Sequence, residues 1–210
     1  MSLREKNKAK NRDKIINAAK EIIREEGLEK LNMRYLANKA EVSLRTPYNL
    51  FGSKTDVLLA LLDDIPQQLF EIAQTTQNSS QLGLLFEIAD QSFQHCLSDE
   101  KFYRDIYWGI MSSEHKESRD RAILTIETLS LPLIHQAITN KELSAELDAK
   151  TFNHHIIIVA VALLGMWGSS QMKASEASNQ IKYTWCNSFL SHATRKSKPE
   201  LLALLKNISL

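Results

Sequence analysis

The fold of this chain is decided by residues 42–54, which read Val-Ser-Leu-Arg-Thr-Pro-Tyr-Asn-Leu-Phe-Gly-Ser-Lys. Residues 33–40 precede them with a helical pattern and are separated from them by a short break, and a second helical pattern follows at once. This is the layout of a helix-turn-helix, in which a short second helix presents its N-terminal residues to the major groove of DNA. The order of these elements therefore predicts an N-terminal DNA-binding domain.

The spacing Val-Ser-x-x-Thr-x-Tyr-x-x-Phe-x-x-Lys resembles the signature of the tetracycline-repressor (TetR) family of transcriptional regulators, over residues 11–62. The resemblance implies an all-α fold. A homeodomain-like, three-helix DNA-binding domain, residues 1–54 with a basic N-terminal tail, is expected to precede a helical effector-binding and dimerisation domain, residues 55–210.

Three residues depart from the family pattern: Glu41 stands where a turn glycine is usual, Arg45 where glycine is common, and Pro47 where a larger apolar residue is usual. Glu41 costs about 1 kcal/mol if the turn needs a positive φ; otherwise the turn is less strained, and the sequence leaves both alternatives open. Pro47 belongs in the first turn of a helix because it lacks an N–H group. Two registers fit, with Ser43 as the cap and a bent first turn, or with Thr46 as the cap and Pro47 first.

Either register directs Leu50 and Phe51 inward. The resemblance implies that Thr46, Tyr48 and Lys54 contact phosphates, while the residues at 44, 45 and 49 face base edges. Arginine can bind guanine with two hydrogen bonds, asparagine can pair with adenine, and leucine can pack on a thymine methyl group. The alternative to a DNA contact is a position in the core for Tyr48 and a solvated position on the helix surface for Arg34. The expected DNA contacts are Asn32, Arg34, Ser43, Leu44, Arg45, Thr46, Tyr48, Asn49 and Lys54.

Cap residues predict where the helices around this segment begin and end. Asn11 is expected to cap the first helix and Gly27 to terminate it. Asn32 is expected to cap the second helix, and Ser53 opens a capping-box pattern. That last helix should continue until Pro66 bends or breaks it.

Charge is divided unevenly along the chain. Residues 1–54 hold 13 basic and 7 acidic side chains, whereas residues 55–210 hold 13 basic and 18 acidic ones. A basic N-terminal module favours a polyanion partner, and neutralising phosphates makes binding dependent on salt. The basic side chains at 4, 6, 8 and 10 would form only a solvated, disordered tail if nothing else were known, but beside a helix-turn-helix they favour DNA.

Residues 67–210 read as successive helices, with no alternating strand and no repeat. An aromatic-rich set is expected to line an apolar effector pocket, with ordinary core packing as the alternative: Phe86, Phe93, Tyr103, Tyr107, Trp108 and Met111. The family resemblance implies that the last two long helices pair with their twins in a dimer. Candidate interface anchors, with burial in the monomer core as the alternative, are Trp167, Trp185 and Phe189.

Several other classes of protein are not favoured. The two cysteines do not suggest a disulfide framework, no signal peptide is visible, and the longest apolar run, Ile156 to Trp167, is too short to cross a bilayer, so we expect a cytoplasmic protein with no membrane partner. Adjacent His154 and His155 diverge on a helix and cannot share a metal ion without a remote third ligand. No catalytic motif or phosphate-binding loop is present. We therefore expect no catalytic residue, no cofactor and no metal.

The sequence thus favours a homodimeric, ligand-responsive transcriptional regulator. The expected partners are a palindromic double-stranded DNA operator and a small apolar or amphipathic effector that releases a repressor from it. The competing class is a ligand-sensing or protein-binding module that has lost sequence-specific DNA binding, an alternative that Glu41 and Pro47 keep open.

Overall fold

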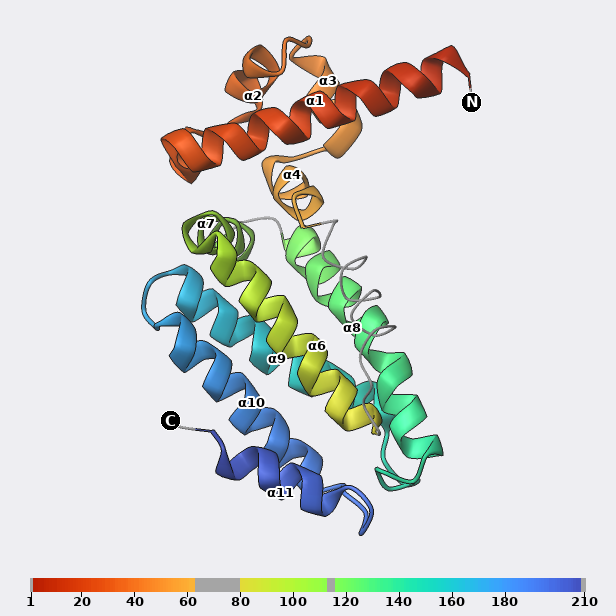
Figure 1. Ribbon diagram of the computed structural model, residues 1–210. Coiled ribbons are helices and arrows are strands. Elements are labelled where there is room, and N and C mark those ends of the chain that lie inside the picture. The colour runs from red at the N-terminus through yellow and green to blue at the C-terminus, as the bar shows by residue number, and fades with distance from the viewer. Residues whose placement is uncertain (1, 63–79, 113–115, 209–210) are drawn as a thin grey trace. The chain divides into compact units, whose positions relative to one another are not determined.

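The computed structural model describes residues 2–62, 80–112 and 116–208 (Figure 1). Within these ranges the chain forms ten α-helices and one short 3-10 helix, η1 (Leu28–Lys30), and contains no strand. An isolated bridge pairs Leu143 with Ala193. The predicted all-α fold is confirmed.

Contacts divide the chain into two compact units. The first contains residues 1–64 and 100–119, and the second contains residues 65–99 and 120–210. The described helices of the first unit are α1 (Leu3–Glu26), α2 (Met33–Lys39), α3 (Arg45–Phe51), α4 (Lys54–Ala60) and α7 (Glu100–Met111). The expected boundary at residue 54 divides the chain differently, because it separates α4 and α7 from the helices that they contact.

The core of the first unit follows from apolar residues at helical spacing. Helix α1 buries Ile15, Ile22 and Ile23 on the face that packs against α2 and α3. Helix α7 buries Phe102, Ile106 and Ile110, which recur at every fourth position and therefore lie on one face. A later segment of the chain thus completes the N-terminal unit.

The second unit contains the remaining described helices. They are α6 (Gln81–Ser98), α8 (Lys116–Thr139, whose first residues belong to the first unit), α9 (Ala149–Gly168), α10 (Ala174–Leu190) and α11 (Lys198–Lys206). Helix α10 contacts α6, α9 and α11 and so joins these three helices. The indole N–H of Trp185 donates to the carbonyl of Ile156 at 3.0 Å, which links α10 to α9 through a buried hydrogen bond.

Most predicted caps are confirmed, and one is wrong. Asn32 accepts a hydrogen bond from the N–H of Tyr35 at 2.9 Å, and Gly27 ends α1 with a φ of 94°. Ser53 caps α4. Asn11, however, caps nothing: α1 begins at Leu3, where Ser2 forms a capping box with the residue three positions later. The predicted end of the fourth helix near Pro66 lies outside the described residues.

Two helices are apolar over a greater length than the longest uninterrupted apolar run of the sequence indicates. Residues 119–139 of α8 and the whole of α9 are long and apolar enough to cross a membrane by length and composition. Helix α9 nevertheless buries Phe152, Ile156 and Trp167 inside the second unit, as a core helix does. Helix α8 continues across Pro132 to Thr139.

Candidate nucleic-acid interface

The turn between α2 and α3 keeps the geometry that glycine favours. Glu41 has a φ of 53°, and its N–H donates to the carbonyl of Asn38 at 3.1 Å. Of the two alternatives that the sequence left open, the structure contains the strained one. A non-glycine residue in the left-handed region costs about 1–2 kcal/mol, so the turn is retained at some expense in stability.

Helix α3 begins in neither of the two registers that the sequence allowed. Its first residue is Arg45, and Leu44 is the N-cap residue without a side-chain cap. Pro47 is therefore the third helical residue, where its missing N–H is one of the four that no helical carbonyl accepts. The N–H of Thr46 donates to the carbonyl of Ser43 at 2.9 Å, and the two side-chain hydroxyls lie 2.8 Å apart. These bonds form the bent entrance to the helix.

One face of α3 is exposed and the other is covered. Leu44 is 45% exposed and Tyr48, one helical turn later, is 51% exposed. Arg45 and Asn49 form a second exposed pair at the same spacing, whereas Pro47 is buried. Tyr48 is therefore not a core residue. A cation, an amide, a hydroxyl-bearing ring and an apolar side chain share this face, which is a set that suits base edges and phosphates.

The start of α2 adds two exposed side chains beside this face. Asn32 is occupied as a cap, because its amide also donates to the carbonyl of Lys30 at 3.2 Å. Arg34 is exposed. A shallow hollow of about 480 Å³ lies here, and its lining includes Asn32, Arg34 and Tyr35. The hydroxyl of Tyr35 donates to the Glu26 carboxylate at 2.8 Å, and this bond raises the pKa of the tyrosine.

Lys54 has a structural partner within its own unit. Its ammonium group donates to the carbonyl of Leu28 at 3.0 Å, and burial lowers the pKa of the amine. The side chain is half-buried, in contrast to the exposed residues of α3. One of its three N–H donors is thus used in holding α4 to the segment after α1.

The expected pocket residues are divided between the two units. Phe86 and Phe93 are buried in α6, where Phe86 lies 6.0 Å from the ring of Phe189 and Phe93 lies 5.6 Å from that of Trp167, measured between centroids. Four residues lie on α7 in the first unit: Tyr103, Tyr107, Trp108 and Met111. Trp108 is 44% exposed, so it is available to a ligand, whereas the two phenylalanines take part in core packing.

The three expected interface aromatics are covered by their own chain. Trp167, Trp185 and Phe189 are all buried within the second unit, which is the monomer-core alternative. Large apolar side chains are exposed elsewhere on the same two helices, at Ile158 and Met166 of α9 and at Tyr183 of α10. A partner could bury these side chains, whereas the three aromatics offer it little further area.

Two kinds of comparison agree with this geometry. Residues 15–61, which span α1 to α4, match the family described as "Bacterial regulatory proteins, tetR family". The structure resembles NalD of Pseudomonas aeruginosa, the secondary repressor of the MexAB-OprM multidrug efflux pump, with 18% identity, a TM-score of 0.57 and coverage of 90% of this chain and 99% of that one. No curated protein sequence matches the chain significantly.

Other solved structures share the fold over most of both chains. SmeT in complex with triclosan has 15% identity, a TM-score of 0.62 and coverage of 89% of this chain and 93% of that one. CprB of S. coelicolor A3(2), described as a TetR family protein, has 13% identity, a TM-score of 0.58 and coverage of 94% and 97%. The order of α2 and α3 and the exposed face of α3 are those of a helix-turn-helix unit. It is the N-terminal part, residues 15–61, that matches the tetR family of bacterial regulatory proteins, while the likeness over the whole chain is one of fold.

Sequence reasoning missed one feature of this unit. The basic N-terminal residues are helical from Leu3 onward, although they contain no apolar periodicity that would indicate a helix. The available signal was Ser2 followed three positions later by Glu5, whose reciprocal hydrogen bonds form a capping box. Among the residues that the structure describes, no group of three histidine, cysteine, aspartate or glutamate side chains could hold a metal ion.

Proposed function

We propose that this protein is a ligand-responsive transcriptional repressor that binds a palindromic operator as a homodimer in the cytoplasm. The observation that carries the proposal is the division of α3 into two faces. Leu44, Tyr48 and their neighbours are exposed, while Pro47 is buried against the unit. The exposed side chains at the N-terminal end of α3 do not pack in the core, and several of them can form hydrogen bonds. In a helix-turn-helix, the N-terminal end of the second helix is where base contacts are made.

Each exposed residue suits a particular part of DNA. Arg45 can donate two hydrogen bonds to a guanine, Asn49 can pair with an adenine, and Leu44 can pack on a thymine methyl group. The hydroxyls of Ser43, Thr46 and Tyr48 suit phosphates, which position the protein without reading sequence. Arg34 suits the phosphate backbone from the start of α2. Asn32 and Lys54 already form hydrogen bonds within the protein. We therefore propose that they mainly hold the DNA-binding helices in place, and that contacting DNA is secondary for them.

A dimer follows from the task, because a palindromic operator presents two half-sites to two reading helices. We place the dimer contacts on the exposed apolar side chains of α9 and α10, namely Ile158, Met166 and Tyr183. A dimer buries such side chains and thereby gains the hydrophobic free energy that a solvated surface cannot.

The effector is proposed to act through α7. This helix packs against α4, which directly follows the reading helix, and it exposes Trp108 on its other side. A ligand that binds better to one arrangement of α7 shifts the population of DNA-binding conformations. SmeT binds triclosan and NalD is a repressor, which supports an apolar or amphipathic effector and a repressor role by analogy.

The test is binding of the full-length protein to labelled DNA segments that flank its own gene, followed by fluorescence anisotropy at low and physiological salt. We expect one segment to bind as a complex with two protomers, and Arg45→Ala to weaken that complex. Arg195→Ala, which removes an exposed arginine from the second unit, is the matched control and should leave binding unchanged. Absence of any complex at low salt across the whole region would instead support the ligand-sensing module without specific DNA binding.

A further inference from the structure

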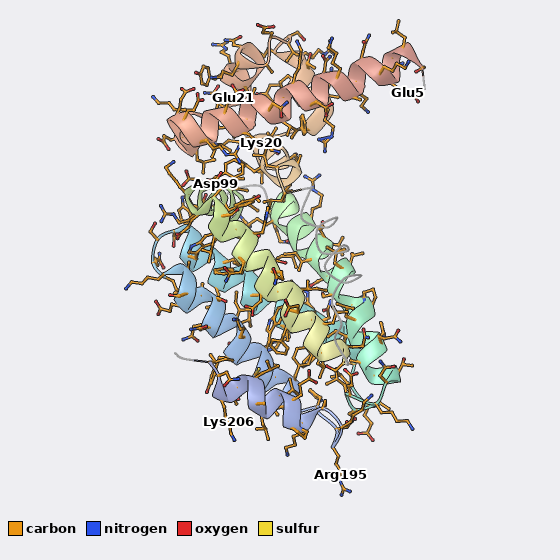
Figure 2. All side chains as sticks on the ribbon, in the orientation of Figure 1. Glu5, Lys20, Glu21, Asp99, Arg195 and Lys206 are labelled. Atoms are coloured by element: carbon orange, nitrogen blue, oxygen red, sulfur yellow. The ribbon has the colours of Figure 1, made fainter. Side chains whose placement is uncertain are left out.

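The first three turns of α1 form a helical arm that buries no apolar side chain. The arm, defined here as residues 3–14, is helical throughout, and the first buried residue of α1 is Ile15. Figure 2 labels Glu5 at the free end of α1, with Lys20 and Glu21 farther along the helix. In Figure 1 the same end continues past α2 and α3. Twelve residues with no core contacts form a marginal helix in water, so packing does not explain why the arm is there.

Basic residues occupy every second position of the arm and fall into two rows on the helix. Residues rotate by about 100° each, so residues four apart lie on one side. One row contains the basic residues at 4, 8 and 12, and the other contains those at 6, 10 and 14. Asn7 and Asn11 lie between the rows, while Glu5 and Asp13 lie on the opposite side. The two rows lie about 160° apart around the helix axis, so the arm is cationic over most of its circumference and confines its two carboxylates to one strip.

This arrangement does not stabilise the arm itself. Cations near the N-terminus of a helix oppose the helix dipole, which favours anions at that end. Within the described part of the chain, Arg4, Lys6, Lys8 and Lys10 form no ion pair, and all four are exposed. The positive charge of these four side chains is therefore available to an anionic partner outside the chain.

The arm is connected to the reading helix through one of its cationic rows. The guanidinium of Arg12 lies 5.2 Å from the ring centroid of Phe51, the last residue of α3. Lys8 and Arg4 continue the same row one and two turns farther out, at a rise of about 1.5 Å per residue. The outer members of the row thus extend for about 12 Å beyond the point where α1 meets α3, on the side of α1 that faces α3.

We propose that the arm binds the phosphate backbone of the operator beyond the segment that α3 reads. Its basic side chains contact phosphates of the duplex, and its amide side chains at 7 and 11, which lie between the two basic rows, donate hydrogen bonds to the same backbone. The arm adds affinity and a longer contact region, and it adds no base preference. This inference rests on the proposed function, because it assigns a further region of the same DNA to this protein.

The test compares the wild type with a variant in which Arg4, Lys6, Lys8 and Lys10 are all changed to glutamine. Glutamine is a good helix former, so the arm should stay helical, which circular dichroism checks. The slope of log K against log salt should become shallower by about 0.9 for each phosphate that the arm no longer neutralises, and affinity in 0.15 M salt should fall at least about tenfold. Ethylation of the outermost phosphates should cease to interfere with binding, while the ratio of operator to non-operator affinity stays constant.

A matched variant changes four exposed basic residues of the second unit to glutamine and removes the same charge: Lys150, Lys173, Arg195 and Lys206. It should keep the slope and the interference pattern of the wild type. An equal change of slope in this variant would show an effect of net charge alone and overturn the proposal. Unchanged slope and pattern in the arm variant would overturn it too, while leaving operator binding by the wild type intact. Failure of the wild type to bind any operator would instead reject the proposed function.

Discussion

The N–H of Val42 donates to the carbonyl of Ala37 at 3.0 Å, and this bond closes the end of α2 with Glu41 in the left-handed conformation between them. It is the long-range bond of a Schellman motif, in which glycine usually occupies the left-handed position. Lys141 and Ser170 have φ values of 59° and 63° and end α8 and α9 in the same way. The three turns are therefore set by helix-end hydrogen bonds, which hold side chains in a conformation that they disfavour.

Replacing Glu41 with glycine should raise the free energy of unfolding by about 1 kcal/mol, because glycine adopts the positive φ without steric cost. Urea denaturation followed by circular dichroism measures the change, and operator affinity should be unaltered. Glu41→Ala is the control, since alanine keeps the Cβ atom and should give no such gain. An equal gain from both variants would attribute the effect to removal of the carboxylate and would contradict the backbone explanation.

Arg45→Ala should weaken operator binding by about 1–3 kcal/mol and relax the preference for one base pair, because alanine cannot donate the two hydrogen bonds to guanine. Arg45→Lys should abolish most of the preference as well, since an ammonium group cannot donate in the same planar geometry. Binding to a set of operators with single base-pair changes measures both effects. A uniform weakening across all operators would assign Arg45 to a phosphate and contradict its role in base recognition.

Glu142 should be critical for the stability of the second unit. Its side chain is 1% exposed, and its carboxylate accepts hydrogen bonds from the N–H groups of Gln81 at 2.9 Å and Leu82 at 3.1 Å, at the start of α6. Glu142→Ala should lower the free energy of unfolding by about 1–3 kcal/mol for each donor left unsatisfied. Thermal unfolding measures this decrease. Glu146→Gln, at an exposed position in the same loop, is the control, and an equal effect there would refute the capping role.

Much of this architecture could be predicted because it depends on local signals. Apolar spacing marked the helices, and Asn32 and Ser53 identified two helix starts through hydrogen bonds within one turn. Local signals do not predict features that depend on tertiary contacts. A periodic pattern shows that Trp167 lies on an apolar face, but it does not show whether the chain or a second copy covers that face. The grouping of α7 with the N-terminal unit likewise depends on contacts between distant segments.

The residues on the exposed face of α3 could be predicted from the sequence, but the residue at which the helix begins could not. The residues on α3 were identified from spacing, and their exposure agrees with that expectation. The first residue of α3 could not be identified from spacing, because proline fits any position in the first turn of a helix and the sequence does not show which one Pro47 occupies. Lys54 shows the same limit, since only the folded structure brings its ammonium group to the carbonyl of Leu28.

The stability of the second unit should fall at alkaline pH through Cys186. Burial raises the pKa of this thiol from 9.0 to about 11. Between these values the unfolded chain has lost the proton and the folded chain keeps it, so unfolding releases a proton and stability decreases as pH rises. The difference in unfolding free energy between wild type and Cys186→Ala should therefore shrink from pH 9 to pH 11. A constant difference across this range would show that the thiol does not titrate with unfolding.

The final prediction concerns the packing of α7 against α4, through which the effector is proposed to act. A Cβ atom added at Gly109 would lie 2.6 Å from Cδ1 of Leu58 and 3.0 Å from Cδ2 of Leu28, and Leu58 is fully buried. Gly109→Ala should therefore push α7 away from α4, lowering the free energy of unfolding by about 1–3 kcal/mol through overpacking. Because α4 directly follows the reading helix, operator affinity should fall as well, and anisotropy measures that decrease.

A double-mutant cycle separates this packing effect from a general decrease in stability. Leu58→Ala alone should destabilise by about 2–5 kcal/mol through the cavity that it leaves. The same substitution makes room for the new methyl group at Gly109, so the double variant should be more stable than the sum of the two single changes predicts, by about 0.5–3 kcal/mol. Operator affinity should recover in parallel. Additive changes in stability, with operator affinity unaffected by Gly109→Ala, would show that the approach of α7 to α4 does not influence the reading helix and would remove this route from the proposed switch.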